Sequence, residues 1–512
     1  MKRGVAAILV LASSCAHAGA CLPAADTVFA DDFERLPAHV YFVATGGNDF
    51  ASGSVDAPWA HVQHAADAMS AGDTACIRGG VYNEVVTMMH SGSADAGPIS
   101  VQAAPGEAAI IDGSSLAIPN GQWGLLTLVD TSYVTIQGLE LRNFATASSA
   151  DVPIGLYLTG AGSGVRVVGN HIHDIRTSAN GCAANAFGLK VDGTRAPASI
   201  NGLAIVGNEI DHLVLGCSES FSLDGNVENW TIRGNRVHDT NNIGIGAIGF
   251  EGVAADPAYD QARDGIISDN TVYAITSFGN PAYGDQYAAD GIYVDGGTRI
   301  VIERNRIYQV DIGIEMASEH AGRTSDAVIA RSNLVYLNNS AGISLGGYDA
   351  SVGGTDQCGV IGNTLFDNDQ AGTGSGELQI QYHATANTIA NNIVYAGAQG
   401  LLVNAFTGDT AAPAAFDYNL YFSAAGSAGS TWTWLGVDYA DFAAWRTAST
   451  QEVHGLFAAP VFVDPVAPDL RVVADSPAVG AGDALGAPIL GALDVAGDPR
   501  VIGFIDIGAY EQ

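Results

Sequence analysis

The sequence predicts an all-β chain folded as a right-handed parallel β-helix, a solenoid whose successive coils pair with one another. Three observations predict this fold. A phrase of aliphatic residues around one asparagine recurs at intervals of 27 to 38 residues, as is typical of solenoid repeats. A second phrase, in which glycine precedes alternating aliphatic residues, lies between the copies. Hydrophobic residues make up 47% of the chain, enough to fill a long core.

The asparagine phrase sets the repeat. It reads VRVVGNHIH at 165–173, and its last, weaker copy is DYNLYF at 417–422. The aliphatic positions are expected to stack inside the coils, and the asparagine side chains to hydrogen-bond along a buried turn. The anchoring residues are Asn170, Asn208, Asn235, Asn270, Asn305, Asn333, Asn363, Asn392 and Asn419.

The glycine phrase supplies a second strand to each coil. Alternation with a period of two places one face of a strand inside and the other outside. At 188–191, Leu189 and Val191 take the inward positions, so Lys190 is expected to project outward. Further copies occur at 155–158, 291–294, 313–316 and 342–345.

The two ends of the chain depart from the repeat. Lys2, Arg3, a short apolar run and Ala-His-Ala at 16–18 predict a signal peptide over residues 1–18, so the protein is expected to be secreted. The remaining chain is expected to divide into an N-terminal linker over 19–39, a parallel β-helix over 40–412, and an irregular insertion, last coil and C-terminal cap over 413–512.

Two short helices are expected outside the coils. Asp56 and Pro58 precede Trp59, Val62, Ala66 and Met69, an amphipathic spacing that predicts a helix sealing the first coil. A second short helix is expected near residues 439–447.

The charge balance excludes a nucleic-acid-binding protein. Lys plus Arg number 20 and Asp plus Glu number 54, a net charge of −34, which becomes −36 once Lys2 and Arg3 are cleaved off. Such a chain cannot release counterions from a phosphate backbone. No apolar run is long enough to span a bilayer, and the protein is assumed to be a monomer.

Five cysteines remain after the predicted cleavage. Cys182 and Cys217 lie about one repeat apart in similar loops, and they are the candidates for a disulfide in an oxidising compartment. Cys21, Cys76 and Cys358 are expected to be unpaired, buried and inert. No cysteine or histidine spacing indicates zinc.

Both ends of the coil region resemble known secreted proteins. YFVATGGNDFASGSVDAPWAHVQHAADAMSAGDTACIRGGVYNEVV at 41–86, continued by GPISVQAAPGEAAIIDG at 97–113, resembles the opening segment of polysaccharide lyase family 9. FVDPVAPDLRVVADSPAVGAGD at 462–483, with DIGAYE at 506–511, resembles the terminal segment of many bacterial members of the wider pectate-lyase-like superfamily. The resemblance implies a polysaccharide lyase that cleaves a uronic-acid polymer by β-elimination.

Lys190 is the leading catalytic candidate. It is the single lysine left in a mature chain that keeps 17 arginines. Lysine, unlike arginine, can lose its proton and act as a base. Its setting, NAFGLKVDG at 185–193, resembles the strand that carries the catalytic lysine of family 9. Arg195 is the candidate cation for the substrate carboxylate, and Tyr157, one coil before Lys190, the candidate general acid.

Three acidic residues near Lys190 could hold calcium. Asp192 and Asp224 end successive strands and are expected to stand about 4.8 Å apart, with Glu219 as a further ligand for a possible Ca²⁺. The alternative is that Asp-Gly pairs only make turns, as is favoured for Asp295. Asp192 would also raise the pKa of Lys190 unless a cation neutralised it. The clustered D-D-G-x-D calcium motif of family 9 is missing from this sequence.

Other outward residues could contact a longer substrate. Tyr293 and Glu315 are expected three and four coils beyond Lys190, with His320 and Arg323 in the following loop. Two other functions remain open. A polygalacturonase-type hydrolase would use Asp192 and Asp224 as acid and base, and a non-catalytic surface protein would only bind carbohydrate.

Overall fold

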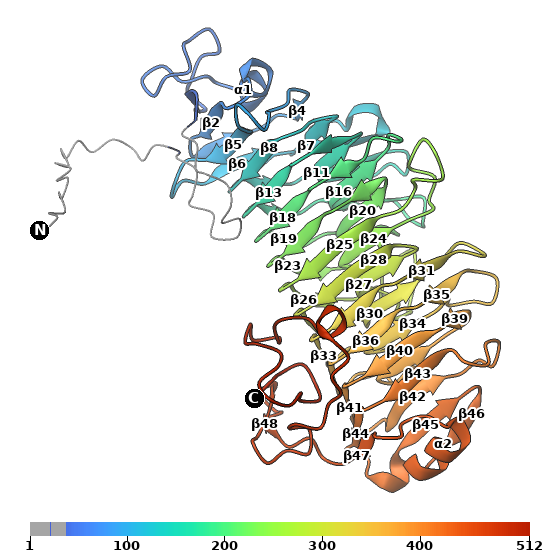
Figure 1. Ribbon diagram of the computed structural model, residues 1–512. Coiled ribbons are helices and arrows are strands. Elements are labelled where there is room, and N and C mark those ends of the chain that lie inside the picture. The colour runs from blue at the N-terminus through green and yellow to red at the C-terminus, as the bar shows by residue number, and fades with distance from the viewer. Residues whose placement is uncertain (1–20, 22–36) are drawn as a thin grey trace, which may run out of the picture.

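The structure is a computed structural model that describes residue 21 and residues 37–512. The predicted signal peptide over 1–18, and the linker over 19–39 except Cys21 and its last three residues, lie outside the described residues. The described chain winds into an elongated right-handed parallel β-helix, as predicted (Figure 1). No helix among the described residues is both long enough and apolar enough to cross a membrane.

Each coil contributes to three parallel sheets that run the length of the molecule. Sheet 1 carries the glycine phrase, and its pairs are parallel except the last. Its strands are β4 (Val86–Met88), β7 (Gln122–Val129), β11 (Val152–Thr159), β16 (Phe187–Gly193), β20 (Phe221–Gly225), β24 (Ile245–Ile248), β27 (Asp290–Asp295), β30 (Ile312–Ala317), β34 (Ile343–Leu345), β38 (Leu378–Ile380), β42 (Leu401–Ala405), β45 (Thr431–Trp434) and β46 (Val437–Tyr439).

Sheet 2 is built from strands that precede the asparagine turn. Its main strands are β1 (Val40–Val43), β2 (Thr74–Ile77), β5 (Ile99–Ala103), β8 (Val134–Gln137), β13 (Arg166–Val168), β18 (Ala204–Val206), β22 (Thr231–Arg233), β25 (Arg263–Ser268), β28 (Thr298–Glu303), β32 (Ile329–Arg331), β36 (Gly359–Ile361), β40 (Asn387–Ala390) and β43 (Ala414–Asp417). Short extensions complete it: β12 (Gly162–Ser163), β17 (Ile200–Asn201), β21 (Val227–Glu228), β31 (Thr324–Asp326), β35 (Gly354–Asp356) and β39 (Ala384–Thr385).

Sheet 3 follows the asparagine turn. Its strands are β3 (Gly80–Tyr82), β6 (Ala109–Asp112), β9 (Glu140–Arg142), β14 (His171–His173), β19 (Glu209–Asp211), β23 (Arg236–Thr240), β26 (Thr271–Ile275), β29 (Arg306–Tyr308), β33 (Leu334–Tyr336), β37 (Thr364–Phe366), β41 (Ile393–Ala396), β44 (Leu420–Ser423) and β47 (Leu456–Phe457). A small pair, β10 (Ala145–Thr146) and β15 (Arg176–Thr177), lies beside it in sequence.

The asparagine side chains form the buried ladder that the repeat predicts. In each step from Asn170 to Asn419, the side-chain oxygen of one asparagine accepts hydrogen bonds from the backbone N–H and side-chain amide of the previous one, at 2.8–3.1 Å. The ladder ends at Glu452, whose carboxyl accepts from the Asn419 amide at 2.6 Å. Burial raises the pKa of Glu452 to about 7. Every turn therefore satisfies its buried polar groups through the next coil.

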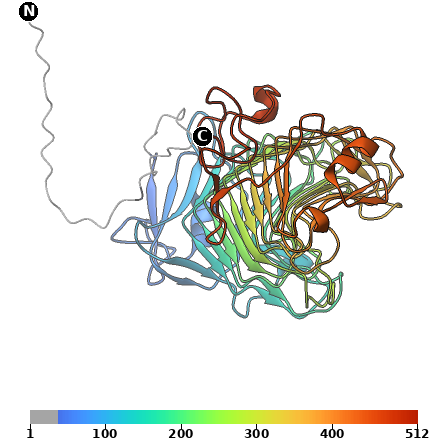
Figure 2. The same ribbon diagram turned by 90° about the horizontal axis from the view of Figure 1, so that it is seen from below.

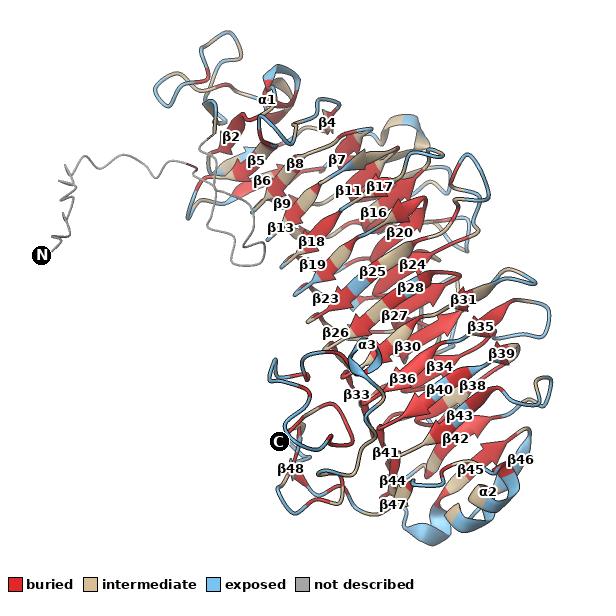
Figure 3. Cartoon of the chain, in the orientation of Figure 1, coloured by how far each residue is buried: buried red, intermediate tan, exposed pale blue. Residues whose placement is uncertain are grey.

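The core fills the space between the three sheets. Inward side chains such as Leu189, Val191 and Ile292 are fully buried, and the buried positions follow the strands along the whole solenoid (Figure 3). Seen from below, the three sheets enclose this interior (Figure 2). The outward side chains therefore form continuous rows on the surface of each sheet.

The first helix begins later than expected. α1 (Val62–Ala68) buries Val62, Ala65 and Ala66 at the N-terminal end of the solenoid (Figure 1). Neither Asp56 nor Pro58 caps it. Instead the carboxyl of Glu84, from the next turn of chain, accepts the backbone N–H groups of Val62 and Gln63 at 2.9 and 3.0 Å. A distant carboxylate thus takes over the role of a local N-cap.

The C-terminal segment closes the other end and folds back along the solenoid. α2 (Phe442–Ser449) begins after Asp441, whose side chain accepts the Ala444 N–H at 3.0 Å, close to the expected helix at 439–447. Trp445 of α2 covers the last coil. The rest of the C-terminal segment contains β48 (Phe462–Asp464), β49 (Asp469–Val472) and α3 (Ala487–Leu490). The chain from β48 onward packs on the outer face of β33, β37 and β41 (Figure 1). Two short helical turns, Pro119–Gly121 and Ser427–Gly429, lie earlier in the chain.

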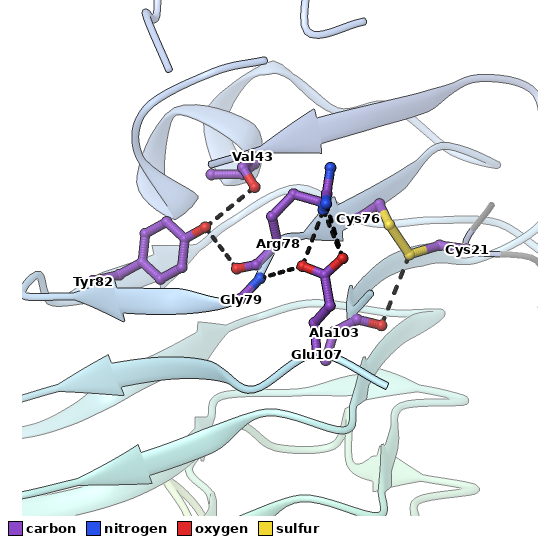
Figure 4. Close-up of a disulfide and its surroundings, with 8 residues drawn as sticks. All are labelled: Cys21, Val43, Cys76, Arg78, Gly79, Tyr82, Ala103 and Glu107. Carbon is purple, nitrogen blue, oxygen red and sulfur yellow. Dashed lines mark hydrogen bonds and ion pairs between the residues drawn. A yellow bond between two sulfur atoms is a disulfide. The ribbon is translucent and has the colours of Figure 1, made fainter. Parts of the chain in front are cut away.

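Two disulfides are present, where one was expected. Cys182 and Cys217 are bonded, as proposed from their spacing. Cys21 and Cys76, expected to be unpaired, form a second disulfide that fixes Cys21 against the outer face of β2 (Figure 4). The sequence gives no signal for this bond, because Cys21 precedes every repeat. Cys358 is buried and free, as expected.

Candidate active site

Two rows of outward side chains on sheet 1 contain Lys190, Tyr157 and the two aspartates predicted beside them. The strand register places Tyr157, Lys190, Ser222, Gly246, Tyr293 and Glu315 in one row, on six successive coils. The second row contains Thr159, Asp192, Asp224, Ile248 and Asp295. Lys190 therefore projects outward, and Tyr157 is its neighbour one coil back, as the alternation predicts.

Lys190 is held by its own strand and by the preceding coil. Its Nζ lies 2.8 and 2.9 Å from the two carboxylate oxygens of Asp192, and 5.0 Å from the centre of the Phe187 ring. Tyr157 donates its hydroxyl hydrogen to Asp192 at 2.7 Å, and Gln122 donates to the Tyr157 oxygen at 3.1 Å. The amine of Lys190 and the phenol of Tyr157 are thus both within hydrogen-bond reach of the Asp192 carboxylate.

The protonation of this cluster depends on two opposing effects. Burial lowers the pKa of Lys190, but the adjacent carboxylate of Asp192 outweighs burial and raises the pKa above its ordinary value. Burial also raises the pKa of Tyr157 to about 12. At neutral pH the cluster thus holds an ammonium group and a neutral phenol.

Asp224 is the unusual carboxyl of the site. It stands in register with Asp192 on the next coil, and it is 93% buried. Within the part of the chain that the structure describes, its buried Oδ1 has no hydrogen-bond partner. Burial raises the pKa of Asp224 to about 8, although Lys190 opposes this effect. Both carboxyl groups are buried, but Asp192 is tied to the Lys190 amine, whereas Asp224 has no such ion pair among the described residues.

Glu219 does not complete a tight cluster with these two aspartates. Burial raises its pKa to about 7. Three groups of residues in the described chain bring at least three potential metal-ligand atoms within 4.8 Å of one another, and none contains Glu219, Asp192 or Asp224. The predicted trio is therefore more open than a preformed three-carboxylate cage.

Arg195 lies away from the amine of Lys190. Its guanidinium forms two hydrogen bonds with Asp130, at 3.1 and 2.7 Å, and its side chain is 60% exposed. Asp130 directly follows β7, two coils earlier, so the pair lies beyond the ends of the site strands. Strand alternation could not foresee this partner, because both residues lie in turns.

The residues predicted to bind distant sugars gather three to four coils away. The Tyr293 hydroxyl donates to Glu319 at 3.2 Å, His320 Nε2 lies 3.1 Å from Glu251, and the Arg323 guanidinium covers the Phe250 ring at 4.8 Å. The strand register puts Tyr293 and Glu315 three and four coils beyond Lys190, as predicted.

Glu315 and the surrounding acids give this second region a different character. Glu315 is 91% buried, where it accepts hydrogen bonds from Ser344 and Gln381 at 3.0 and 3.1 Å, and burial raises its pKa to about 7. Glu251, Asp295 and His320 converge within 4.8 Å. The sequence interpretation missed Glu251, which comes from a loop without a repeat signal.

Comparison with known proteins bears on the family and fold of the chain. The model of the "Pel9A-like, right handed beta helix region" family matches residues 41–206, which include Lys190, Asp192 and Tyr157. The "Uncharacterized protein YwoF" of Bacillus subtilis (strain 168) is 37% identical over 441 residues, covering 85% of this chain and 91% of that protein. The chain belongs to the family of YwoF. Its N-terminal coils are a Pel9A-like β-helix region.

Two further relatives bear on the fold of this family. "Pectate lyase PEL9" of Emericella nidulans is 33% identical over 164 residues, which span 30% of this chain and 36% of that protein. The crystal structure of pectate lyase Pel9A superposes with a TM-score of 0.51 at 15% identity, covering 93% of this chain and 97% of Pel9A. At this identity the structural likeness shows the pectate-lyase-like β-helix fold alone.

Proposed function

We propose that the protein is a secreted polysaccharide lyase that cleaves a uronic-acid-containing polysaccharide by β-elimination. One observation carries the proposal. Lys190, the single lysine of the described chain, projects from the outer face of sheet 1 inside the Pel9A-like region. It contacts the carboxylate of Asp192, which Tyr157 of the preceding coil also contacts. Two disulfides among the described residues, and the signal-peptide pattern at the N-terminus, support export.

The reaction assigns one role to each group. Lys190 Nζ, as a free amine, takes the proton from C5 of the uronate. The electron pair of that C–H bond forms the C4=C5 double bond, and the C4–O bond breaks. The departing oxygen takes a proton from a general acid, for which Tyr157 is the candidate in reach. The products are an unsaturated sugar and a new sugar hydroxyl.

The raised pKa of Lys190 sets the condition for this chemistry. An ammonium group cannot accept a proton, so the rate should rise as pH rises toward the pKa of Lys190. Neutralising the Asp192 carboxylate would lower that pKa and move the activity toward neutral pH. The paired position of Asp192 and Lys190 therefore makes charge control at Asp192 part of the proposal.

Calcium is the cation whose chemistry suits this site. Asp192 and Asp224 offer carboxylate oxygens on adjacent coils, and the buried Oδ1 of Asp224 has no donor among the described residues. These two residues would hold Ca²⁺, with Glu219 as a more distant ligand. When bound, the ion supplies positive charge beside the substrate carboxylate and Asp192. Arg195 would add a cation at the rim, and Tyr293, Glu315, His320 and Arg323 would border outer sugar positions.

The pair of unlike carboxyls favours a second candidate function. A hydrolase of the polygalacturonase type needs one proton-donating and one ionised carboxyl across the scissile bond. Asp224, whose pKa is about 8, would be the acid, and Asp192 the base. Lys190 would then bind the substrate carboxylate and keep its proton.

A polymer panel separates these functions. The purified protein is incubated with pectate, alginate and other uronate polymers, with and without Ca²⁺, and ultraviolet absorbance and reducing ends are followed together. The proposal expects both signals, because elimination creates a C4=C5 bond in every new non-reducing end. Reducing ends without absorbance would establish the hydrolase instead. Binding without cleavage of any polymer would contradict both enzymatic functions.

A further inference from the structure

A second cluster of chemically active side chains lies on sheet 3, away from Lys190. In the register of β14, β19 and β23, His171, Glu209 and Arg236 form one outward row, and His173, Asp211 and His238 the next. The inward residues between them, Ile172, Ile210 and Val237, are fully buried. Three adjacent coils thus bring three imidazoles and two carboxylates to one patch of surface. We propose that Glu209, Asp211 and His238 bind a divalent transition-metal ion of the zinc class.

The distances within the patch suit such an ion. His238 Nε2 lies 3.1 Å from Glu209 Oε1 and 3.9 Å from Asp211 Oδ2, and one ligand atom from each of the three residues lies within 4.8 Å of the others. Ligands at about 2.0–2.2 Å from a tetrahedral ion are separated by about 3.3–3.6 Å, which the observed values bracket. Asp211 is shared by two of the three candidate ligand groups in the described chain, His171–His173–Asp211 and Glu209–Asp211–His238. It is therefore the natural centre of the site.

The hydrogen bonds of His238 provide an independent argument. Its Nδ1 lies 2.7 Å from a carboxylate oxygen of Asp239. Because a carboxylate only accepts, Nδ1 carries the hydrogen, and in the neutral ring Nε2 is left with a lone pair. That lone pair faces the acceptor oxygens of Glu209 and Asp211. A metal ion between them would be bound by this lone pair and by the two carboxylates, and a histidine fixed from behind by a carboxylate is the usual support of a metal ligand.

The charge of the patch also calls for a cation. Glu209, Asp211 and Asp239 surround His238, whereas Arg236 pairs only with Glu209 among them, at 2.8 Å. The neighbouring His212 contacts Asp211 Oδ2 at 3.0 Å from the exposed side. A divalent ion would balance the negative charge of Glu209 and Asp211. Imidazole and carboxylate ligands favour zinc over calcium.

Such an ion would tie two consecutive coils together. β19 and β23 lie on the side of the solenoid that faces away from β16 and β20 in Figure 1, so the ion would not contact the substrate of Lys190. Its expected role is to lock the register of β19 and β23. This inference does not depend on the proposed lyase activity.

Zinc titration of the intact, chelator-treated protein tests the site. Isothermal calorimetry with Zn²⁺ alone should show one saturable site per chain, and Zn²⁺ should raise the unfolding temperature. Asp211→Asn should weaken binding at least about 100-fold, and Asp239→Asn, which leaves all three ligands in place, about 10-fold. His454→Ala is the matched control, because His454 pairs with one aspartate, Asp417, near the last coil. The Zn²⁺ affinity of His454→Ala should equal that of the wild type.

Two results would overturn the assignment. One is the lack of saturable Zn²⁺ binding by the wild type, which would mean that protonated imidazoles balance the carboxylates. The other is unchanged affinity in both Asp211→Asn and Asp239→Asn, which would place the bound ion elsewhere. Circular dichroism of each metal-free variant shows that it is folded, and Asp239→Asn keeps the test decisive if Asp211→Asn does not fold.

Discussion

Replacing Asp224 by asparagine should change how stability depends on pH. Asp224 is 93% buried, and burial raises its pKa from 3.8 to about 8. The folded protein therefore holds a proton there between about pH 4 and pH 8, and the unfolded chain does not. Stability must fall as pH rises through this window, by about 1.4 kcal/mol per pH unit for one proton. Across the window the free energy of unfolding falls by roughly 5 kcal/mol.

Asparagine keeps the shape of the side chain and needs no proton. Asp224→Asn should therefore be more stable than the wild type at pH 8, and this difference in unfolding free energy should be smaller at pH 5. The assay is urea unfolding of both proteins at several pH values, which gives the difference in unfolding free energy directly. Asp349→Asn, at an exposed loop position, is the control and should leave the slope above pH 5 unchanged. Parallel wild-type and Asp224→Asn curves would refute the reasoning, since they would show that Asp224 is ionised in the folded state.

Two other changes probe the site and the fold. Asp192→Asn removes a carboxylate 2.8 Å from Lys190, an attraction of about 6 kcal/mol at an effective dielectric constant of about 20. The rising limb of the pH–rate profile should therefore move at least about one pH unit lower. An unmoved limb would show that Lys190 is not the titrating base. Asn305→Ala opens the asparagine ladder at both neighbours, and leaving buried donors and acceptors unpaired should lower the unfolding free energy by about 2–4 kcal/mol. Gln357→Ala, on an exposed turn, is its control, and equal losses in the two variants would mean that the ladder adds no stability.

The sequence could predict whatever depends on the repeat alone. The spacing of the asparagines fixed which residues stack, so the ladder from Asn170 to Asn419 and the outward direction of Lys190 followed from periodicity. The distance of three coils between Lys190 and Tyr293 followed in the same way. Each of these features depends on one strand position repeated in successive coils.

Features that depend on turns and loops could not be predicted in this way. Arg195 pairs with Asp130 because two turns of unrelated sequence meet beyond the ends of the strands. Cys21 meets Cys76 across 55 residues that carry no common pattern. Asp224 Oδ1 is buried without a hydrogen-bond partner within the described chain, which no local motif records.

The substitution of Lys190 by arginine tests the central claim most directly. Arginine keeps the positive charge and the ion pair with Asp192 but cannot lose its proton. With a polymer that the wild type cleaves, and Arg233→Ala as a surface control, the rate of formation of unsaturated product is measured across alkaline pH. The account predicts that Lys190→Arg loses this activity while its unfolding temperature stays close to that of the wild type. Full activity in Lys190→Arg would show that the residue only binds the substrate, and would contradict its role as the base.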